Sequence, residues 1–153
     1  MDNCHTIRLE FSSVFEMLDL VQIVSDAFGR LAGLDDDGVH WAGVAIRESV
    51  INAIKHGNRN DAEKSVFVEF VARSPQAAGQ NGSQPDAEFV VRVRDQGEGF
   101  DVDAVGDPLA PENLLKASGR GIFFMRSFMD DVSLGRAPQG GTEVRMVKKI
   151  RRG

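Results

Sequence analysis

The stretch from residue 48 to residue 57 has the sequence ESVINAIKHG, and it carries polar side chains on a segment that is otherwise suited to burial. Glu48, Asn52 and His56 follow one another at intervals of four residues, which places them along one face of an α-helix. Most positions around them are apolar. A buried carboxylate or amide without a partner is costly, so each should be paired. A solvated helix face that bonds to its neighbours is the ordinary alternative.

The helix that contains this stretch is predicted to run from about Asp36 to His56. Three acidic residues, Asp35 to Asp37, stand where the positive end of a helix dipole favours negative charge. Gly57 follows at an expected C-cap position. The segment therefore has both a start signal and a stop signal for a helix.

Another helix is predicted before it. Ser13 and Glu16 match a capping box, and Gly33 marks the end of this helix. Its apolar face follows steps of three and four residues: Val14, Met17, Val21, Val24, Phe28 and Leu31. Three more apolar residues lie off this face, namely Leu18, Leu20 and Ile23. We interpret them as further core residues, with contact to another protein as the alternative.

Alternation of apolar and polar residues with a period of two predicts the strands. They cover Thr6 to Phe11, Ser65 to Arg73, Glu88 to Asp95, Val132 to Leu134 and Thr142 to Lys149. The stretch Ser74 to Ala87 is rich in Gly, Gln, Asn, Ser, Pro and Ala, so it predicts a long loop between two antiparallel strands. The expected fold class is α+β: a two-layer sandwich of a mixed, mostly antiparallel sheet with helices on one face.

A glycine-containing segment, RDQGEGF at residues 94–100, follows the third predicted strand. The carboxylate of Asp95 is an acceptor only, and at a strand end it can accept a bond from an exocyclic amine such as that of adenine. Gly97 and Gly99 leave room for a flat ring or a phosphate near the backbone. A plain turn after a strand would explain the same residues.

A second glycine cluster, SGRGI at residues 118–122, opens a short predicted helix from Ile122 to Met129. Backbone N–H groups at a helix start bind phosphate, and glycine lets the backbone approach closely. Arg120, between Gly119 and Gly121, would add a charge-assisted bond to a phosphate. A flexible start to the helix is the alternative.

Length and composition restrict the function classes. A chain of 153 residues suits one domain, expected over residues 1–153. The net charge of -5 argues against nucleic acid or an anionic membrane as the main partner. The one cysteine, Cys4, excludes a disulfide within the chain and favours a reducing compartment. No signal peptide or membrane-spanning apolar run is found, so we expect a cytoplasmic location.

The order of the motifs resembles the GHKL ATPase superfamily. The pattern is a helix with E-x-x-x-N, a strand ending in D-x-G-x-G-F, S-G-R-G-I opening a helix, and G-G-T starting the last strand. ESVINAIKHG at 48–57 and GRGIFFMRSFMDD at 119–131 resemble most closely the anti-sigma-factor serine kinases. The similarity extends from the first strand to about Lys149 and implies the Bergerat ATP-binding fold.

The resemblance implies ATP and Mg²⁺ as ligands. Asn52 would coordinate Mg²⁺ through its amide oxygen, and Glu48 would be the general base on the attacking hydroxyl. Asp95 would accept the adenine amine, with Thr142 supporting the same base directly or through water. The other implied residues belong to the adenine pocket, the lid over the phosphates and the phosphate end: Gly97 and Gly99; Gly119, Arg120 and Gly121; Lys55 and His56.

Two features depart from the family pattern. The loop from Ser74 to Ala87 is longer than the usual hairpin, but it lies away from the motifs. The lid from Phe100 to Ser118 contains few basic residues, with only Lys116 before Arg120. The residues that would hold the γ-phosphate are therefore less well defined than those that would hold the base.

The implied function is phosphoryl transfer from ATP to a serine of a small anti-anti-sigma protein of the STAS type, with binding of a sigma factor and formation of a homodimer. One alternative is a nucleotide-dependent binding module with little or no kinase activity, against which the presence of Glu48 argues. Another is the ATPase part of a histidine kinase or of a gyrase-like or chaperone-like machine. That reading is disfavoured because no phosphoacceptor hairpin or transducer domain flanks the motifs, and none of His5, His40 and His56 lies in such a hairpin.

Overall fold

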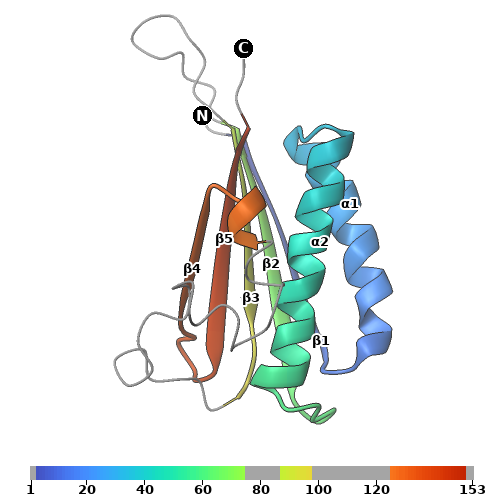
Figure 1. Ribbon diagram of the computed structural model, residues 1–153, viewed down its shortest axis with the longest axis vertical. Helices are drawn as coiled ribbons and strands as arrows, with labels where there is room; N and C mark the ends of the chain where they lie inside the picture. The colour runs from blue at the N-terminus through green and yellow to red at the C-terminus, as the bar shows by residue number, and fades with distance from the viewer. Residues whose placement is uncertain (1–2, 75–86, 98–124, 151–153) are drawn as a thin grey trace, which may run out of the picture.

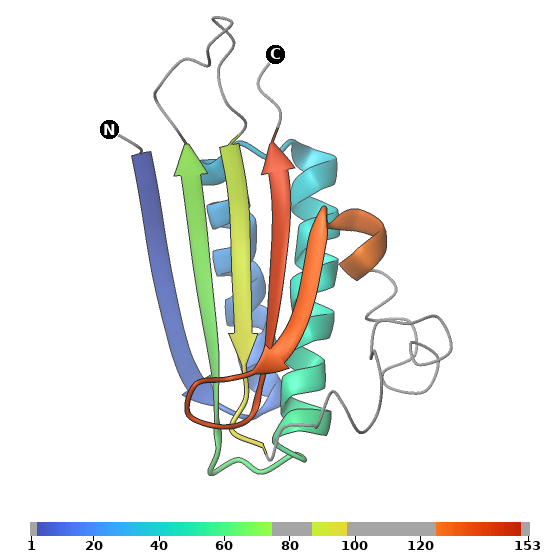
Figure 2. The same cartoon turned by 90° about the vertical axis from the view of Figure 1, so that its left-hand side faces the viewer.

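The computed structural model describes residues 3–74, 87–97 and 125–150. These residues form a sheet with the strand order β1-β2-β3-β5-β4, with two helices on one of its faces (Figures 1 and 2). The strands are β1 (Asn3–Ser12), β2 (Ser65–Ser74), β3 (Ala87–Arg94), β4 (Asp131–Arg136) and β5 (Thr142–Ile150). The helices are α1 (Leu18–Ala32) and α2 (Asp36–Asn52). The expected α+β sandwich is confirmed.

All neighbouring strands in the described part of the sheet are antiparallel. The strands on either side of the predicted loop pair from Phe67 opposite Arg94 to Arg73 opposite Glu88. The last strand, β5, lies between β3 and β4 rather than at an edge. This order brings the start of β5 beside the end of β3, where Asp95 follows.

The core lies between the helices and the sheet. Phe28 of α1 contacts Phe70 of β2 and Phe89 of β3, with ring centroids 5.7 and 6.2 Å apart. Side chains at every second strand position face the helices, so Val66, Val68 and Phe70 of β2 are almost completely buried. Burial of this apolar face is the main force that holds the two layers together.

The predicted capping box at the start of α1 is wrong. A 3-10 turn, Phe15–Met17, precedes the helix, its N-cap is Val14, and no side chain caps it. Ser13 is instead buried, and its N–H donates to the carbonyl of Lys64 at 3.0 Å. This backbone contact joins Ser13 to the chain before β2, and its buried hydroxyl bonds to no described residue, so Ser13 does not cap the helix. Gly33 does end α1, with a left-handed φ of 104°.

The apolar residues of α1 divide differently from the prediction. Leu18 is buried in the core, as interpreted, together with Val21 and Phe28. Leu20 and Ile23 are 49% and 66% exposed, so their interpretation as core residues is wrong. Leu31, predicted on the core face, is 58% exposed. A helix with 3.6 residues per turn places all three exposed residues on one flank, away from the residues that pack on the sheet.

Candidate functional site

α2 carries the first half of the predicted site. Its N-cap is Asp35, whose Oδ1 accepts from the N–H of Gly38 at 2.7 Å. The helix remains α-helical to Asn52 and continues into a π-helical turn, Ala53–Gly57. Single π turns inside or beside α-helices occur often at functional sites. The predicted helix is therefore present, but its last turn is wider than an α turn.

Glu48 and Asn52 lie one turn apart on α2, and both side chains are partly buried. Among the described residues, neither side chain takes part in a hydrogen bond or an ion pair. A partly buried carboxylate and amide without partners among the described residues are suited to polar groups of a ligand. Lys55 and His56, in the π turn, are exposed.

Asp95 forms the second half of the site, immediately after β3. It is only 6% exposed, and its Oδ1 accepts from the N–H groups of Gly97 at 2.9 Å and Thr142 at 3.0 Å. Its own N–H donates to the carbonyl of Thr142 at 3.1 Å. The start of β5 therefore holds Asp95 through both backbone groups of Thr142. Among the described residues, Oδ2 accepts no hydrogen bond, so it can accept one from a ligand.

Burial raises the pKa of the Asp95 carboxyl, because desolvation disfavours the charged form. The hydrogen bonds from Gly97 and Thr142 and the positive charge of Lys64 act in the opposite direction without overcoming it. A buried carboxyl whose pKa is shifted in this way is typical of a binding or catalytic position.

Three glycines surround Asp95 closely. A Cβ on Gly57 would collide with the Asp95 carboxylate, one on Gly97 with the carbonyl of Gly57, and one on Gly141 with the carbonyl of Asp95. Gly141 also has a left-handed φ of 83°. The absence of side chains at these positions lets three chain segments meet around one carboxylate.

Gly57 packs against the Asp95 carboxylate, and it does not end the helix as predicted. The residue after the π turn is Asn58, and the left-handed residues that follow are Arg59 and Asn60, with φ of 54° and 59°. The prediction of Gly57 as the C-cap is therefore wrong. The nearby carboxylate of Asp95, not the end of the helix, requires a glycine there.

Asn58 is a site residue that the sequence did not single out. It is fully buried, with its Nδ2 donating to the carbonyl of Ser65 at 2.9 Å and its Oδ1 accepting from the N–H of Gln96 at 2.7 Å. In the sequence, an Asn after a helix indicates only a turn. Its hydrogen bond to Gln96, which lies far along the chain, cannot be recognised from the residues around Asn58.

The structure therefore brings together the predicted residues at the end of α2 and at the end of β3, and it adds Gly57, Asn58 and Gly141. Thr142 reaches Asp95 through its backbone, and its half-buried hydroxyl bonds to no described residue. Four predicted residues, Gly99, Gly119, Arg120 and Gly121, lie outside the described residues. The described residues contain no cluster of three or more His, Cys, Asp or Glu that would hold a metal ion.

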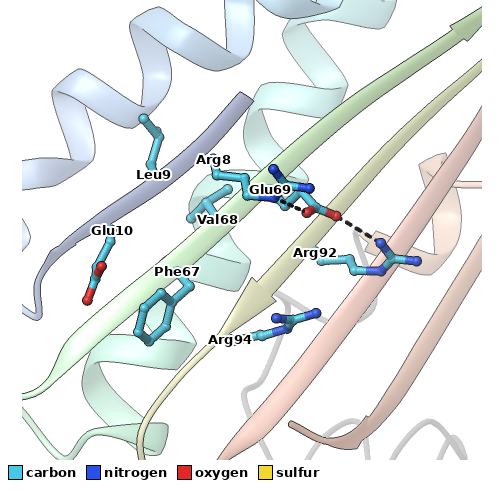
Figure 3. A pocket seen from close by; sticks show the side chains of 8 residues that line it. All are labelled: Arg8, Leu9, Glu10, Phe67, Val68, Glu69, Arg92 and Arg94. Carbon is cyan, nitrogen blue, oxygen red and sulfur yellow. Dashed lines mark hydrogen bonds and ion pairs between the residues drawn. The ribbon is translucent and has the colours of Figure 1, made fainter. Parts of the chain in front are cut away.

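A pocket of about 300 Å³ lies elsewhere, on the sheet face opposite the helices (Figure 3). Its floor is a row of ion pairs in which Glu69 accepts from Arg8 and Arg92, each at 2.8 Å. Partial burial acts to raise the pKa of Glu69, but these two arginines outweigh it and hold the pKa below its usual value. These ion pairs link β1, β2 and β3 across the outer face of the sheet.

Comparisons with known proteins agree with this arrangement. A model of the histidine kinase-like ATPase domain matches residues 13–148. The anti-sigma F factor of Oceanobacillus iheyensis is 30% identical over 148 residues, which cover 94% of this chain and 92% of that protein. The serine-protein kinase RsbW of Staphylococcus epidermidis is 27% identical over 157 residues, covering 95% of this chain and 87% of that protein.

A solved structure is also similar in fold. The crystal structure of the RsbU and RsbW domains of a Mycobacterium tuberculosis protein matches with a TM-score of 0.61 at 15% identity. The match covers 97% of this chain and 33% of that longer chain. No helix in the described part of this chain is long and apolar enough to cross a membrane. The family match over most of the chain shows that it belongs to the histidine kinase-like ATPase family, in the branch of anti-sigma factors and RsbW-type serine kinases.

Proposed function

We propose that this chain binds ATP with Mg²⁺ and transfers the γ-phosphoryl group to a serine of a small anti-anti-sigma protein of the STAS type. It also binds a sigma factor, and it does both as a homodimer of single-domain subunits. The observation that carries the proposal is the buried Asp95 carboxylate, surrounded by Gly57, Gly97 and Gly141, whose Oδ2 accepts no hydrogen bond from any described residue.

The base end of ATP fits at Asp95. Its Oδ1 accepts from two backbone N–H groups, whereas Oδ2 bonds to no described residue and would accept from the exocyclic amine of adenine. Thr142 binds the same carboxylate through its backbone N–H, and its half-buried hydroxyl would support the base directly or through water. Gly97 would belong to the same adenine pocket, and the lack of a side chain lets its backbone pack against the carbonyl of Gly57 beside the carboxylate.

The phosphate end fits at the last turns of α2. Asn52 offers an amide oxygen, which suits Mg²⁺, an ion that usually keeps waters and phosphate oxygens as its other ligands. When bound, the ion would neutralise charge on the phosphates. Lys55 and His56 are exposed nearby and would meet the phosphates or the solvent above them.

Glu48 is assigned the chemical step. Its carboxylate would take the proton from the serine hydroxyl while that oxygen bonds to the γ-phosphorus and the bond to the ADP oxygen breaks. The side chain is partly buried and bonds to no described residue, so it is available as a base. Gly99 would complete the adenine pocket, and Gly119, Arg120 and Gly121 would close over the phosphates.

The test is incubation with ATP, Mg²⁺ and a candidate anti-anti-sigma partner, followed by mass measurement of that partner. Addition of one phosphoryl group to a serine supports the proposal. ATP binding without transfer to any candidate would instead favour a nucleotide-dependent binding module. Absence of ATP binding would reject both.

A further inference from the structure

Asn58 connects three chain segments around the proposed nucleotide site. Its backbone N–H donates to the carbonyl of Ala53 at 2.7 Å, which closes the π turn after α2. Its side chain spans from Ser65, the first residue of β2, to Gln96, which follows β3. Gln96 in turn accepts from the N–H of Ser65 at 2.7 Å through its Oε1. Asn58, Ser65 and Gln96 therefore form a closed ring of hydrogen bonds.

This ring acts on Asp95 through the main chain. The N–H of Gln96 belongs to the peptide group that follows Asp95, and Asn58 fixes that group at 2.7 Å. On the other side, the backbone of Asp95 is held by Thr142 at 3.1 Å. Residue 95 is thus held from both directions, by β5 on one side and by the end of α2 on the other.

We propose that Asn58 is a positioning residue for base recognition, which holds the Asp95 carboxylate in place relative to the turn that follows Asn52. The inference rests on the proposed function, because it gives Asn58 a part in holding adenine. Asn58 is fully buried, so it does not touch the nucleotide itself. Its effect on binding passes through Gln96 to Asp95.

A purely structural role makes a different prediction. A buried amide whose two hydrogen bonds are lost destabilises the fold wherever it lies. A positioning role also changes the choice of base, because Asp95 recognises an amine only when its carboxylate is correctly placed. ATP carries that amine, whereas ITP carries a carbonyl oxygen at the same position, which would face the carboxylate as a second acceptor. The ratio of the two affinities therefore separates the roles.

The experiment measures dissociation constants for ATP and ITP, each with Mg²⁺, in the full chain by calorimetry. The variants are Asn58→Ala, Asn58→Asp and the core control Val21→Ala, with thermal melts for each. In Asn58→Ala we expect ATP affinity to fall about tenfold or more and the ATP preference to shrink, since both bonds are lost. Val21→Ala, which opens a small cavity in the core but removes no hydrogen bond of Asn58 or Asp95, should lower the melting temperature and keep the ATP preference.

Asn58→Asp separates stability from positioning. It keeps the acceptor for Gln96 but sets a carboxylate oxygen against the carbonyl of Ser65, so it should be at least as unstable as the alanine variant. It should nevertheless retain more of the ATP preference. An ATP preference in Asn58→Ala equal to that of the wild type would overturn the inference.

A measurement on the unchanged protein covers the case in which the variants do not fold. Hydrogen exchange of the Gln96 N–H should be as slow as in β3, because its acceptor is fully buried. Exchange as fast as at the exposed turn residue Gln139 would mean that the Asn58 bond is not formed, and the inference would fail. A wild-type protein that binds ATP and ITP equally would reject the proposed base recognition, and with it this role.

Discussion

The carboxylate of Asp95 occupies the space where a side chain on Gly57 would begin. Gly57 lies in the π turn after α2, whereas Asp95 follows β3, so this contact joins the two halves of the site. The same carboxylate is bonded to the start of β5 through Thr142. The position of one acidic side chain therefore depends on three elements that are distant in the sequence.

Gly57→Ala should abolish nucleotide binding with a moderate loss of stability. A methyl group at this position must displace Asp95, and overpacking of this kind costs about 1–3 kcal/mol of unfolding free energy. Calorimetric titration with ATP and a thermal melt measure the two effects. The matched control is Gly135→Ala, because a Cβ there meets no atom within 4 Å. Normal ATP binding by the Gly57 variant would show that Asp95 has room to move.

Asp95→Asn should separate stability from binding. Because burial raises the pKa of Asp95, the folded protein binds a proton more readily than the unfolded chain. The contribution of Asp95 to the free energy of unfolding therefore falls as the pH rises from its pKa in the unfolded chain through its pKa in the folded protein. This contribution stays low at neutral pH. Asparagine does not titrate and can keep the acceptor for Gly97 and Thr142, so the nucleotide-free variant should be more stable than the wild type near pH 7.

Thermal melts without nucleotide, taken from acidic to neutral pH, test this expectation. The gain should be largest at neutral pH and should shrink toward acidic pH, where Asp95 is protonated in the wild type. ATP binding should be lost at every pH, because the amide presents a donor where adenine needs an acceptor. A variant less stable than the wild type at neutral pH would mean that the charge-assisted bonds outweigh the cost of burial.

Periodicity predicted the sheet well because it reports burial directly. On β2, for example, Val66, Val68 and Phe70 alternate with more exposed residues and all face the helices. Local signals failed where a distant segment decides the outcome. Ser13 has the sequence of a cap but is bonded to Lys64, and Gly57 has the sequence of a helix stop but makes room for Asp95.

In the site, too, the sequence reveals local motifs but not the contacts between distant segments. The motif order pointed to Asn52 and Asp95, and the structure places them at neighbouring ends of α2 and β3. Asn58 was missed because its side chain bonds to Gln96, which is distant in the sequence, and no spacing rule contains such a contact. Leu20 and Ile23 were misassigned because an apolar residue on a helix is ordinarily buried, and only the observed packing shows which flank is left uncovered.

Charged residues on the exposed apolar flank of α1 should weaken self-association of the protein. Leu20, Ile23 and Leu31 are all about half or more exposed, and they form one apolar stripe. If the proposed homodimer uses this stripe, the double change Leu20→Glu with Ile23→Glu should yield a monomer in sedimentation. Surface changes usually alter stability by no more than about 0.5 kcal/mol, so the melting temperature of the monomer should change little. Arg47→Glu, at an exposed position on α2, is the control that should leave the assembly unchanged.

Glu48→Ala tests the step from binding ATP to using it. Loss of a general base usually slows a reaction by about 10²–10⁴-fold, so phosphoryl transfer to the partner serine should fall by that order. ATP affinity should stay close to the wild-type value, because Asp95 and Asn52 are untouched. Arg47→Ala, the exposed neighbour on α2, should leave both quantities unchanged. Transfer at the normal rate by the Glu48 variant would assign the base elsewhere, and loss of ATP binding would show that Glu48 supports the nucleotide rather than the chemistry.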